Sequence, residues 1–283
     1  MPGLKKRVAS GLGALPLSVL FLVLMLIPLL LTVILSFRQF DYQAGIMPGY
    51  TLSHYIEVLT DSYFLEIFWR TLWMSALTTV ICLLIGAPEA YILSRMRNPW
   101  RSVFLLVVLS PLLVSLVVRA FGWTILLNPE GPVGRVLGAF GIESVMYSPV
   151  AVVIALVHVM LPFMVIPVWT SLQKIDPAVE HAAYSLNATP FQTLVKVIFP
   201  QAVPGMLSGS LIVFGLTASS FAIPGLLGGR RVKVVATEVY DQFLFDLNWP
   251  LGSAIAILLL VANLVIMLSY SRIVERSYKR SLG

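Results

Sequence analysis

Residues 176–205 read DPAVEHAAYSLNATPFQTLVKVIFPQAVPG, a polar, proline-rich stretch between two long apolar runs. A polar stretch of this length in an apolar chain is kept out of the lipid, where unpaired backbone groups are costly. Asp176-Pro177 predicts a helix start, with Asp as the N-cap and Pro in the first turn. Leu186-Asn187 predicts its end, because Asn tolerates the left-handed conformation that closes many helices.

A second helix is predicted to begin directly after this turn. Thr189 and Gln192 have the spacing of a capping box, and Pro190 falls at the first helical position. Pro200 and Pro204 are expected to end this helix, since proline removes a backbone donor. Residues 174–205, which we name the elbow, are thus predicted to form a helix–turn–helix on a membrane surface, suited to docking against another protein.

The composition of the whole chain predicts a membrane protein. Of its 283 residues, 58% are hydrophobic and 11% are charged, unlike a soluble domain. Spanning the hydrocarbon takes about 20 apolar residues per helix. Stretches that qualify lie at residues 14–37, 67–93, 103–127, 149–170, 206–226 and 251–270. The predicted fold class is all-α: a polytopic membrane protein with six transmembrane helices in one domain, residues 1–283.

The distribution of basic residues predicts the orientation in the membrane. If the N-terminus is inside, twelve of the nineteen Lys and Arg residues fall in inner segments. Cytoplasmic loops carry this excess, so both termini and the elbow are expected in the cytoplasm. The net charge of +6 is therefore explained by topology. No basic stripe alternates with aromatic residues, so nucleic acid is not an expected partner.

Motifs of enzymes are missing from the sequence. It contains no G-x-x-x-x-G-K-[ST] phosphate loop, no His/Cys/Asp cluster with metal-ligand spacing and no Gly-x-Ser-x-Gly elbow. A membrane enzyme would need titratable residues that converge within the spans. A secondary carrier would need paired broken helices or charges at mid-depth, and the sequence indicates one break. We therefore expect no catalytic activity and no bound cofactor or metal in this chain.

The elbow carries a recognisable pattern, made by Glu180, His181, Ala182, Ala183, Leu186, Asn187, Ala188 and Phe191 and followed by Ile198-Phe199-Pro200. This pattern resembles the EAA cytoplasmic loop of binding-protein-dependent ABC importer permeases. In that family the short loop helix docks into a cleft on a separate ATPase subunit. If the Ala-Ala pairs align, His181 stands where the family has Glu, and Asn187 stands where Gly is usual. Whether Glu180 or His181 makes the polar contact is open at this stage.

The resemblance extends along the chain to the first permease subunit of spermidine/putrescine-type importers. It is carried by Arg119-Ala120-Phe121-Gly122-Trp123, residues 158–164 and residues 224–229. It implies a type I importer fold in the bacterial inner membrane, with the elbow as coupling helix. It also implies a heterodimer with a second permease, two ATP-binding subunits that use the ATP, and an extracytoplasmic solute-binding protein. The expected cargo is a polyamine, with an amino acid or a derivative such as 4-aminobutyrate as the alternative.

Polar groups within apolar spans are costly and mark candidate substrate contacts. The candidates are Arg119, Trp123, Thr217, Ser219, Ser220 and Phe221, the last four lying before a predicted helix break at Pro224-Gly225. Ser and Thr also serve ordinary helix packing, and Arg119 can extend to the outer interface. Glu89, near the inner end of the second span, is a candidate ion-pair partner for Arg95 or Arg97.

Overall fold

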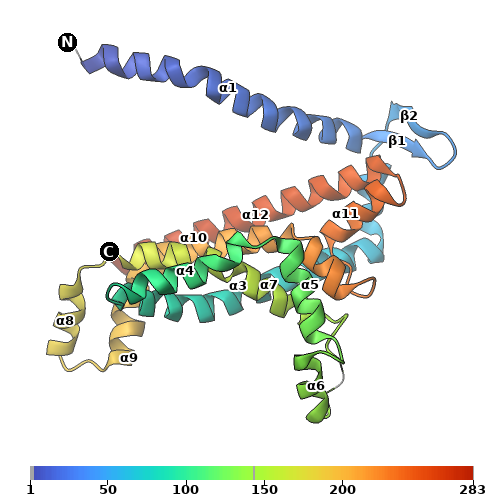
Figure 1. The fold of residues 1–283 in the computed structure, drawn as a ribbon. Helices are drawn as coiled ribbons and strands as arrows, with labels where there is room; N and C mark the ends of the chain where they lie inside the picture. Colours follow the sequence, from blue (N-terminus) through green and yellow to red (C-terminus); the bar gives the residue numbers. More distant parts are fainter. Residues whose placement is uncertain (1–2, 143, 283) are drawn as a thin grey trace. The chain divides into compact units, whose positions relative to one another are not determined.

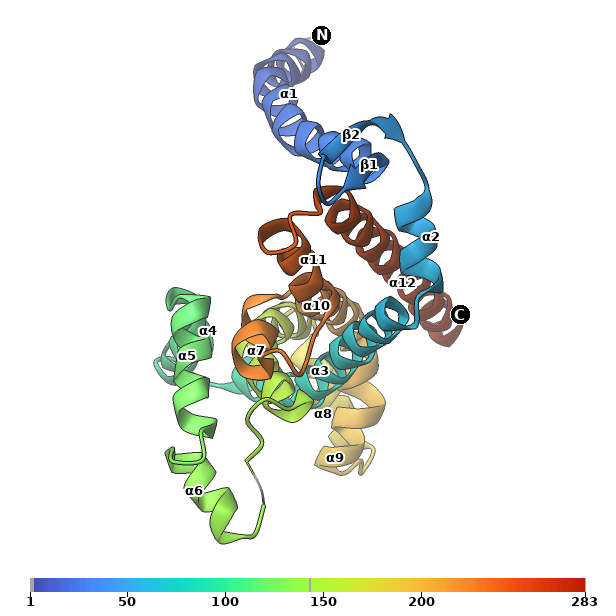
Figure 2. The same ribbon diagram turned by 90° about the vertical axis from the view of Figure 1, so that its right-hand side faces the viewer.

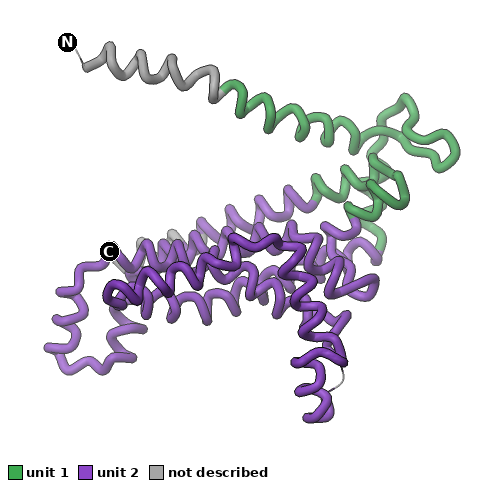
Figure 3. The backbone as a smooth tube through the Cα atoms, in the orientation of Figure 1, with its two compact units in different colours: residues 1–61, 239–258 green, residues 62–238, 259–283 purple. Residues whose placement is uncertain are grey.

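The structure, a computed structural model, describes residues 3–142 and 144–282 and is predominantly helical (Figures 1 and 2). Its elements are α1 (Gly3–Ser36), β1 (Arg38–Asp41), β2 (Gly45–Tyr50), α2 (Ser53–Thr60), α3 (Ser62–Arg95), α4 (Trp100–Leu113), α5 (Leu116–Leu127), α6 (Pro132–Ala139), α7 (Pro149–Leu172), α8 (Pro177–Ser185), α9 (Pro190–Thr193), η1 (Leu194–Ile198), α10 (Phe199–Ala218), η2 (Pro224–Gly228), α11 (Val235–Leu244) and α12 (Trp249–Leu282). The chain divides into two compact units, residues 1–61 with 239–258 and residues 62–238 with 259–283 (Figure 3).

Unit 1 contains α1 and a small β-hairpin. In α1, the segment Val19–Ser36 has a mean hydropathy of 3.0, and only 6% of it is buried. A helix that is apolar on every side suits a lipid environment. Strands β1 and β2 pair antiparallel, a hairpin that the all-α prediction did not include. The Asp41 carboxylate holds its turn by accepting the N–H groups of Gln43 (2.8 Å) and Ala44 (2.9 Å).

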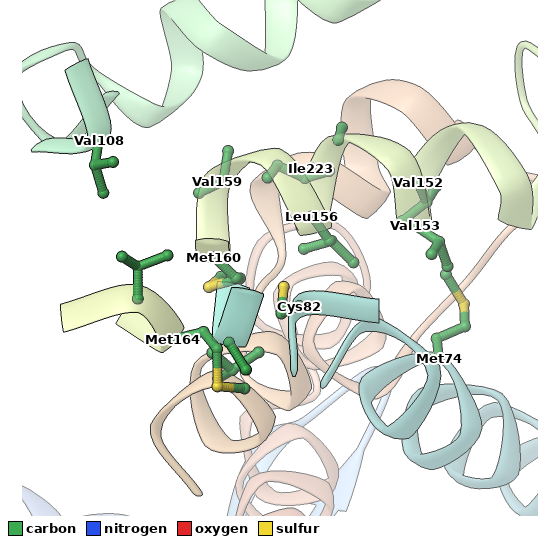
Figure 4. Close-up of a cluster of buried hydrophobic side chains, with 14 of the residues drawn as sticks. Met74, Cys82, Val108, Val152, Val153, Leu156, Val159, Met160, Met164 and Ile223 are labelled. Carbon is green, nitrogen blue, oxygen red and sulfur yellow. The ribbon is translucent and has the colours of Figure 1, made fainter. Parts of the chain in front are cut away.

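Unit 2 is organised around α7, which packs against both α3 and α10. In α7, 61% of the membrane-spanning window is buried, a larger share than in any other candidate span of the described chain. Figure 4 shows Met74 of α3 beside Val153 of α7, and Cys82 of α3 near Leu156 of α7. The tight core comes from these long apolar side chains and from small residues on the neighbouring helices.

Two glycines bring α10 close to α7. A Cβ atom on Gly205 would lie 2.5 Å from the Ser171 Cβ and 2.6 Å from the Pro167 carbonyl oxygen. A Cβ atom on Gly209 would lie 2.8 Å from the Met164 sulfur. Glycines four residues apart are typical of closely packed membrane helices. This pair of glycines was not among the sequence predictions, and it positions α10, the helix that leads to the candidate pathway residues.

The predicted spans are largely confirmed, with one correction of shape. Among the described residues, five helices are long and apolar enough to cross a membrane. The span predicted at residues 103–127 is not straight, because α4 and the helical stretch from Leu116 meet at an angle of 95°. Val114, between them, is extended, with φ −100° and ψ 138°. The bent pair brings the number of possible spans in the described chain to six.

The fifth span begins earlier than predicted. Pro200 and Pro204 do not end the second elbow helix, because α9, η1 and α10 form one apolar helical segment, Pro190–Ala218. The wide π turn η1 ends at Ile198, two residues before Pro200, and such turns accommodate changes in the helical hydrogen-bond pattern. The break also differs from the prediction. The segment ends at Ala218, and Pro224-Gly225 starts the short helix η2 instead of interrupting the span.

Candidate functional site

The elbow has the local structure that its sequence predicts. The Asp176 carboxylate caps α8 by accepting the Ala178 N–H at 2.8 Å. Asn187 adopts the left-handed conformation, with φ 60°. Thr189 and Gln192 form a reciprocal capping box, with hydrogen bonds of 3.3 and 3.0 Å. These interactions give two short helices a fixed connection, and Figure 1 shows them at one end of unit 2.

The elbow presents apolar side chains to its surroundings. Leu186 is 83% exposed and Phe191 is 74% exposed. His181, Ala182 and Asn187 are also exposed, whereas Ala188 is half-buried. Ala183, expected to contact the partner, is instead buried, and its carbonyl accepts the N–H groups of Leu186 and Ala188, each at 3.1 Å. Ala183 therefore stabilises the turn that orients Leu186.

Glu180 points toward α3. Its carboxylate accepts hydrogen bonds from the Tyr91 hydroxyl at 2.8 Å and the Tyr184 hydroxyl at 3.2 Å. It also pairs with the Arg95 guanidinium at 2.5 Å, so Arg95 is matched with Glu180 and not with Glu89. The Glu180 side chain is only 13% exposed. Glu180 is thus held inside the chain, and His181 is the polar side chain that faces outward beside it.

The pKa of Tyr184 is raised, first by desolvation and then by its hydrogen bond to the Glu180 carboxylate. Protonated tyrosine is a hydrogen-bond donor, and a raised pKa keeps it protonated well above neutral pH. Tyr184 therefore remains a donor to Glu180 over the physiological range. The Glu180 carboxylate thus has two hydroxyl donors and one guanidinium group around it.

A second polar group joins α5 and α7. The Trp123 Nε1–H donates to His158 Nδ1 at 3.2 Å, and the two rings meet edge to face at 5.6 Å. Because indole N–H can only donate, Nδ1 is the acceptor, and the neutral His158 ring carries its proton on Nε2. Arg119 lies close enough for its charge to act on this ring. The substrate contacts predicted from the sequence include Arg119 and Trp123 but not His158, which is 35 residues beyond Trp123 and belongs to the stretch 158–164.

The guanidinium of Arg119 is incompletely satisfied. Its Nε and Nη1 atoms are buried and have no hydrogen-bond partner in the described part of the chain. Buried polar groups usually have partners, so an orphaned guanidinium indicates an acceptor supplied from elsewhere. Arg119, Trp123 and His158, which we name the α5–α7 cluster, therefore form a site rich in donors.

The other pathway candidates lie where α10 ends. Thr217 is buried, and neither its hydroxyl nor that of Ser220 has a partner among the described residues. The Ser219 hydroxyl returns to its own helix, donating to the Gly215 carbonyl at 2.9 Å. Phe221 is 49% exposed. The following helix η2 packs against both α5 and α7, so the break adjoins the helices that carry the α5–α7 cluster.

Glu238 belongs to a network that sequence analysis did not detect. Glu238 is 3% exposed, and its carboxylate accepts hydrogen bonds from the Tyr63 hydroxyl at 2.8 Å and Lys233 Nζ at 3.0 Å. Arg70 donates to the Lys233 carbonyl at 3.2 Å. These bonds fasten the segment after η2 to the start of α3. Glu238 is therefore already neutralised and is a poor receptor for a cationic solute.

Comparison with known proteins gives this geometry a context. The family described as binding-protein-dependent transport system inner membrane component matches residues 83–279. The spermidine/putrescine transport system permease protein PotB of Haemophilus influenzae is 33% identical over 251 residues, covering 87% of each chain. PotB of Escherichia coli K12 is 30% identical over 250 residues, covering 87% of this chain and 90% of its own.

Solved structures show the same fold. A chain of the bacterial alginate ABC transporter, crystallised with its alginate pentasaccharide-bound periplasmic protein, superposes with a TM-score of 0.80. The superposition covers 97% of this chain and 96% of the other, at 20% identity. The helical arrangement, the position of the elbow between two spans and the sequence match all indicate the same family. The chain belongs to the family of binding-protein-dependent transport system inner membrane components, the permease subunits of ABC importers.

Proposed function

We propose that this permease subunit imports a small organic amine of the polyamine type. The main support is the pair of relatives that are 33% and 30% identical over 87% of the chain, both described as spermidine/putrescine permeases. In this proposal a second permease completes a heterodimer, and an extracytoplasmic binding protein delivers the solute. Two separate subunits bind and hydrolyse the ATP, and this chain binds no cofactor. Both termini lie in the cytoplasm.

The elbow is the proposed coupling site. Leu186 and Phe191 are exposed on a rigid turn, as apolar anchors at protein interfaces often are. Closure of the ATPase dimer would move a docked elbow as a unit, because the capping interactions resist local unwinding. The helices attached to it would then change between outward-facing and inward-facing arrangements, a two-state change driven by differential binding.

A specific observation favours a second candidate cargo. Arg119 and the His158 Nε2–H are both hydrogen-bond donors, and Arg119 carries two buried, unpartnered nitrogens. An ammonium group is also only a donor and would be repelled here, whereas a carboxylate would be satisfied. The Trp123 face can attract an ammonium group through a cation–π interaction. This chemistry suits an amino acid or a derivative such as 4-aminobutyrate.

Substitution of Arg119 by Gln separates the two cargo classes. If the cargo is a polyamine, we expect putrescine and spermidine uptake by the reconstituted transporter to stay within about threefold of the native rate. If the cargo carries a carboxylate, loss of the charge-assisted hydrogen bonds should reduce its uptake by at least about tenfold. The measurement is uptake of radiolabelled putrescine, spermidine and 4-aminobutyrate into proteoliposomes.

Arg135→Gln provides the matched control, because Arg135 is exposed on α6 and has the same charge. It should leave uptake of every solute unchanged. If the native complex takes up polyamines and excess 4-aminobutyrate does not inhibit this uptake, the result supports a polyamine as the cargo. Uptake of 4-aminobutyrate alone, lost in the Arg119 variant, would replace the polyamine with an amino-acid derivative as the cargo.

A further inference from the structure

We propose that Glu180 is a positioning residue that locks α8 to the C-terminal end of α3, so that the two helices move as one body when the transporter cycles. The inference rests on the proposed coupling role of the elbow. In this proposal Glu180 holds α8 against α3 within the permease. The contact with the ATPase subunit is made by the exposed side chains next to Glu180.

The contacts of Glu180 carry this inference. Tyr91 and Arg95, both in the last turns of α3, contact different oxygens of its carboxylate. The Arg95 guanidinium also lies over the Tyr91 ring, 5.5 Å from its centre. Tyr184, one turn further along α8, donates to the same carboxylate oxygen as Tyr91. We name these four residues the clasp. Charge-assisted bonds of this kind are about twice as strong as neutral ones and are directional.

The clasp supplies a support that α8 otherwise lacks. Helix α8 has nine residues, too few for a stable helix without packing. It packs against α9 and η1, which follow it in sequence, and is joined to α7 through residues 173–176. These neighbours are all close to α8 in sequence. The clasp adds a contact with α3, which is distant in sequence, and so fixes the rotation of α8 relative to the spans.

The orientation fixed in this way decides which side chains are exposed. With Glu180 held against α3, its neighbour His181 points outward, because successive residues differ by about 100° around a helix. Leu186 and the turn at Asn187 keep their exposed positions at the end of the same helix. Loss of the clasp should therefore change the orientation of these exposed side chains without removing them. ATP hydrolysis would then be less tightly coupled to transport.

Distance measurement tests the common motion directly. Spin labels at Ile92→Cys in α3 and Ser185→Cys in α8, both exposed positions, would report the separation of the two helices in the assembled transporter, with Cys82→Ala removing the native thiol. We expect one narrow distance distribution that is the same without nucleotide and with ATP trapped. In Glu180→Gln the distribution should broaden and differ between the two states. A native complex whose label distance changes between the states would overturn the proposal.

Coupling ratios provide the functional readout. In Glu180→Gln, the number of solutes imported per ATP hydrolysed should fall by at least about fivefold, as expected for loss of one coupling interaction. Arg95→Gln should have a similar effect, and the double variant should be no worse than either single variant, because the pair acts as a unit. Arg97→Gln, an exposed charge two residues from Arg95, is the control and should retain the native ratio.

These results separate the clasp from the coupling site itself. A native ratio in Glu180→Gln, or additive losses in the double variant, would refute the clasp. If Glu180→Gln fails to assemble, the coupling ratio of Arg95→Gln compared with that of Arg97→Gln still decides the question, and a native ratio in Arg95→Gln would refute the clasp. A Leu186→Asp variant with native coupling would instead refute docking through the elbow, whatever the clasp variants show.

Discussion

Replacing Leu186 by Asp is expected to reduce transport by the assembled importer at least about tenfold, as expected when an interface anchor is lost. The Leu186 side chain is 83% exposed at the tip of the elbow. Burying a leucine against a partner stabilises the contact by roughly 1.5–3 kcal/mol. A carboxylate at the same position would lose this gain and would also require desolvation. Solute-stimulated ATP hydrolysis and uptake in proteoliposomes are the measurements.

Leu186→Met is the matched control, since it preserves volume and apolar character and should transport at close to the native rate. Protease accessibility of the intact membrane should show that Leu186→Asp inserts normally. Ala183→Asp would be a weaker test of docking than Leu186→Asp. Ala183 is buried, and its carbonyl holds the turn, so a charge there would disrupt the elbow itself. Native, solute-stimulated hydrolysis in Leu186→Asp would contradict the coupling role.

Substitution of Gly205 by Val is expected to destabilise the permease by about 3 kcal/mol, near the upper end for overpacked cores. The added Cβ would lie 2.6 Å from the Pro167 carbonyl and 3.0 Å from the Val168 Cα. Both are backbone atoms of α7, so no side-chain rotation relieves the clash. The helices must separate, and the buried contacts between α7 and α10 weaken. The measurement is the thermal unfolding midpoint of the purified subunit in detergent.

Gly122→Val is the control for this substitution. Gly122 lies in α5, and a Cβ added there meets no atom within 4 Å. The two variants therefore have the same change in helix propensity but differ in steric conflict. We expect Gly122→Val to unfold close to the native temperature. Equal midpoints for the two variants would show that the close approach of α10 to α7 does not limit stability.

The local structure of the elbow could be predicted because its signals are contained within a few residues. Asp176, Asn187 and the Thr189–Gln192 pair each act on the backbone next to them, and all adopt the predicted geometry. Pro200 and Pro204 misled the prediction because proline alone does not decide whether a helix ends. The preceding π turn adjusts the hydrogen-bond pattern, and packing against α7 retains the helix beyond it.

Contacts between distant segments could not be predicted in the same way. Nothing in the sequence indicates that the Glu180 carboxylate forms an ion pair with Arg95 instead of facing solvent. Nor does it indicate that His158 lies beside Trp123. The bend at Val114 had a partial signal in Pro111, but proline is common in straight membrane helices. The four-residue spacing of Gly205 and Gly209 in α10 is visible in the sequence, but the sequence does not show that α7 is the helix they pack against. The role of the candidate site residues remains a prediction for the experiments described above.

The length of the segment Pro190–Ala218 has a consequence for how it can cross a bilayer. At about 1.5 Å per residue, the 20 residues of α10 extend roughly 30 Å, about the thickness of the hydrocarbon. The residues Pro190–Ile198 that precede α10 in the same segment are therefore not needed for the crossing. Gln192 and Lys196 lie among them, so a single crossing by α10 leaves both polar side chains with the elbow, outside the lipid.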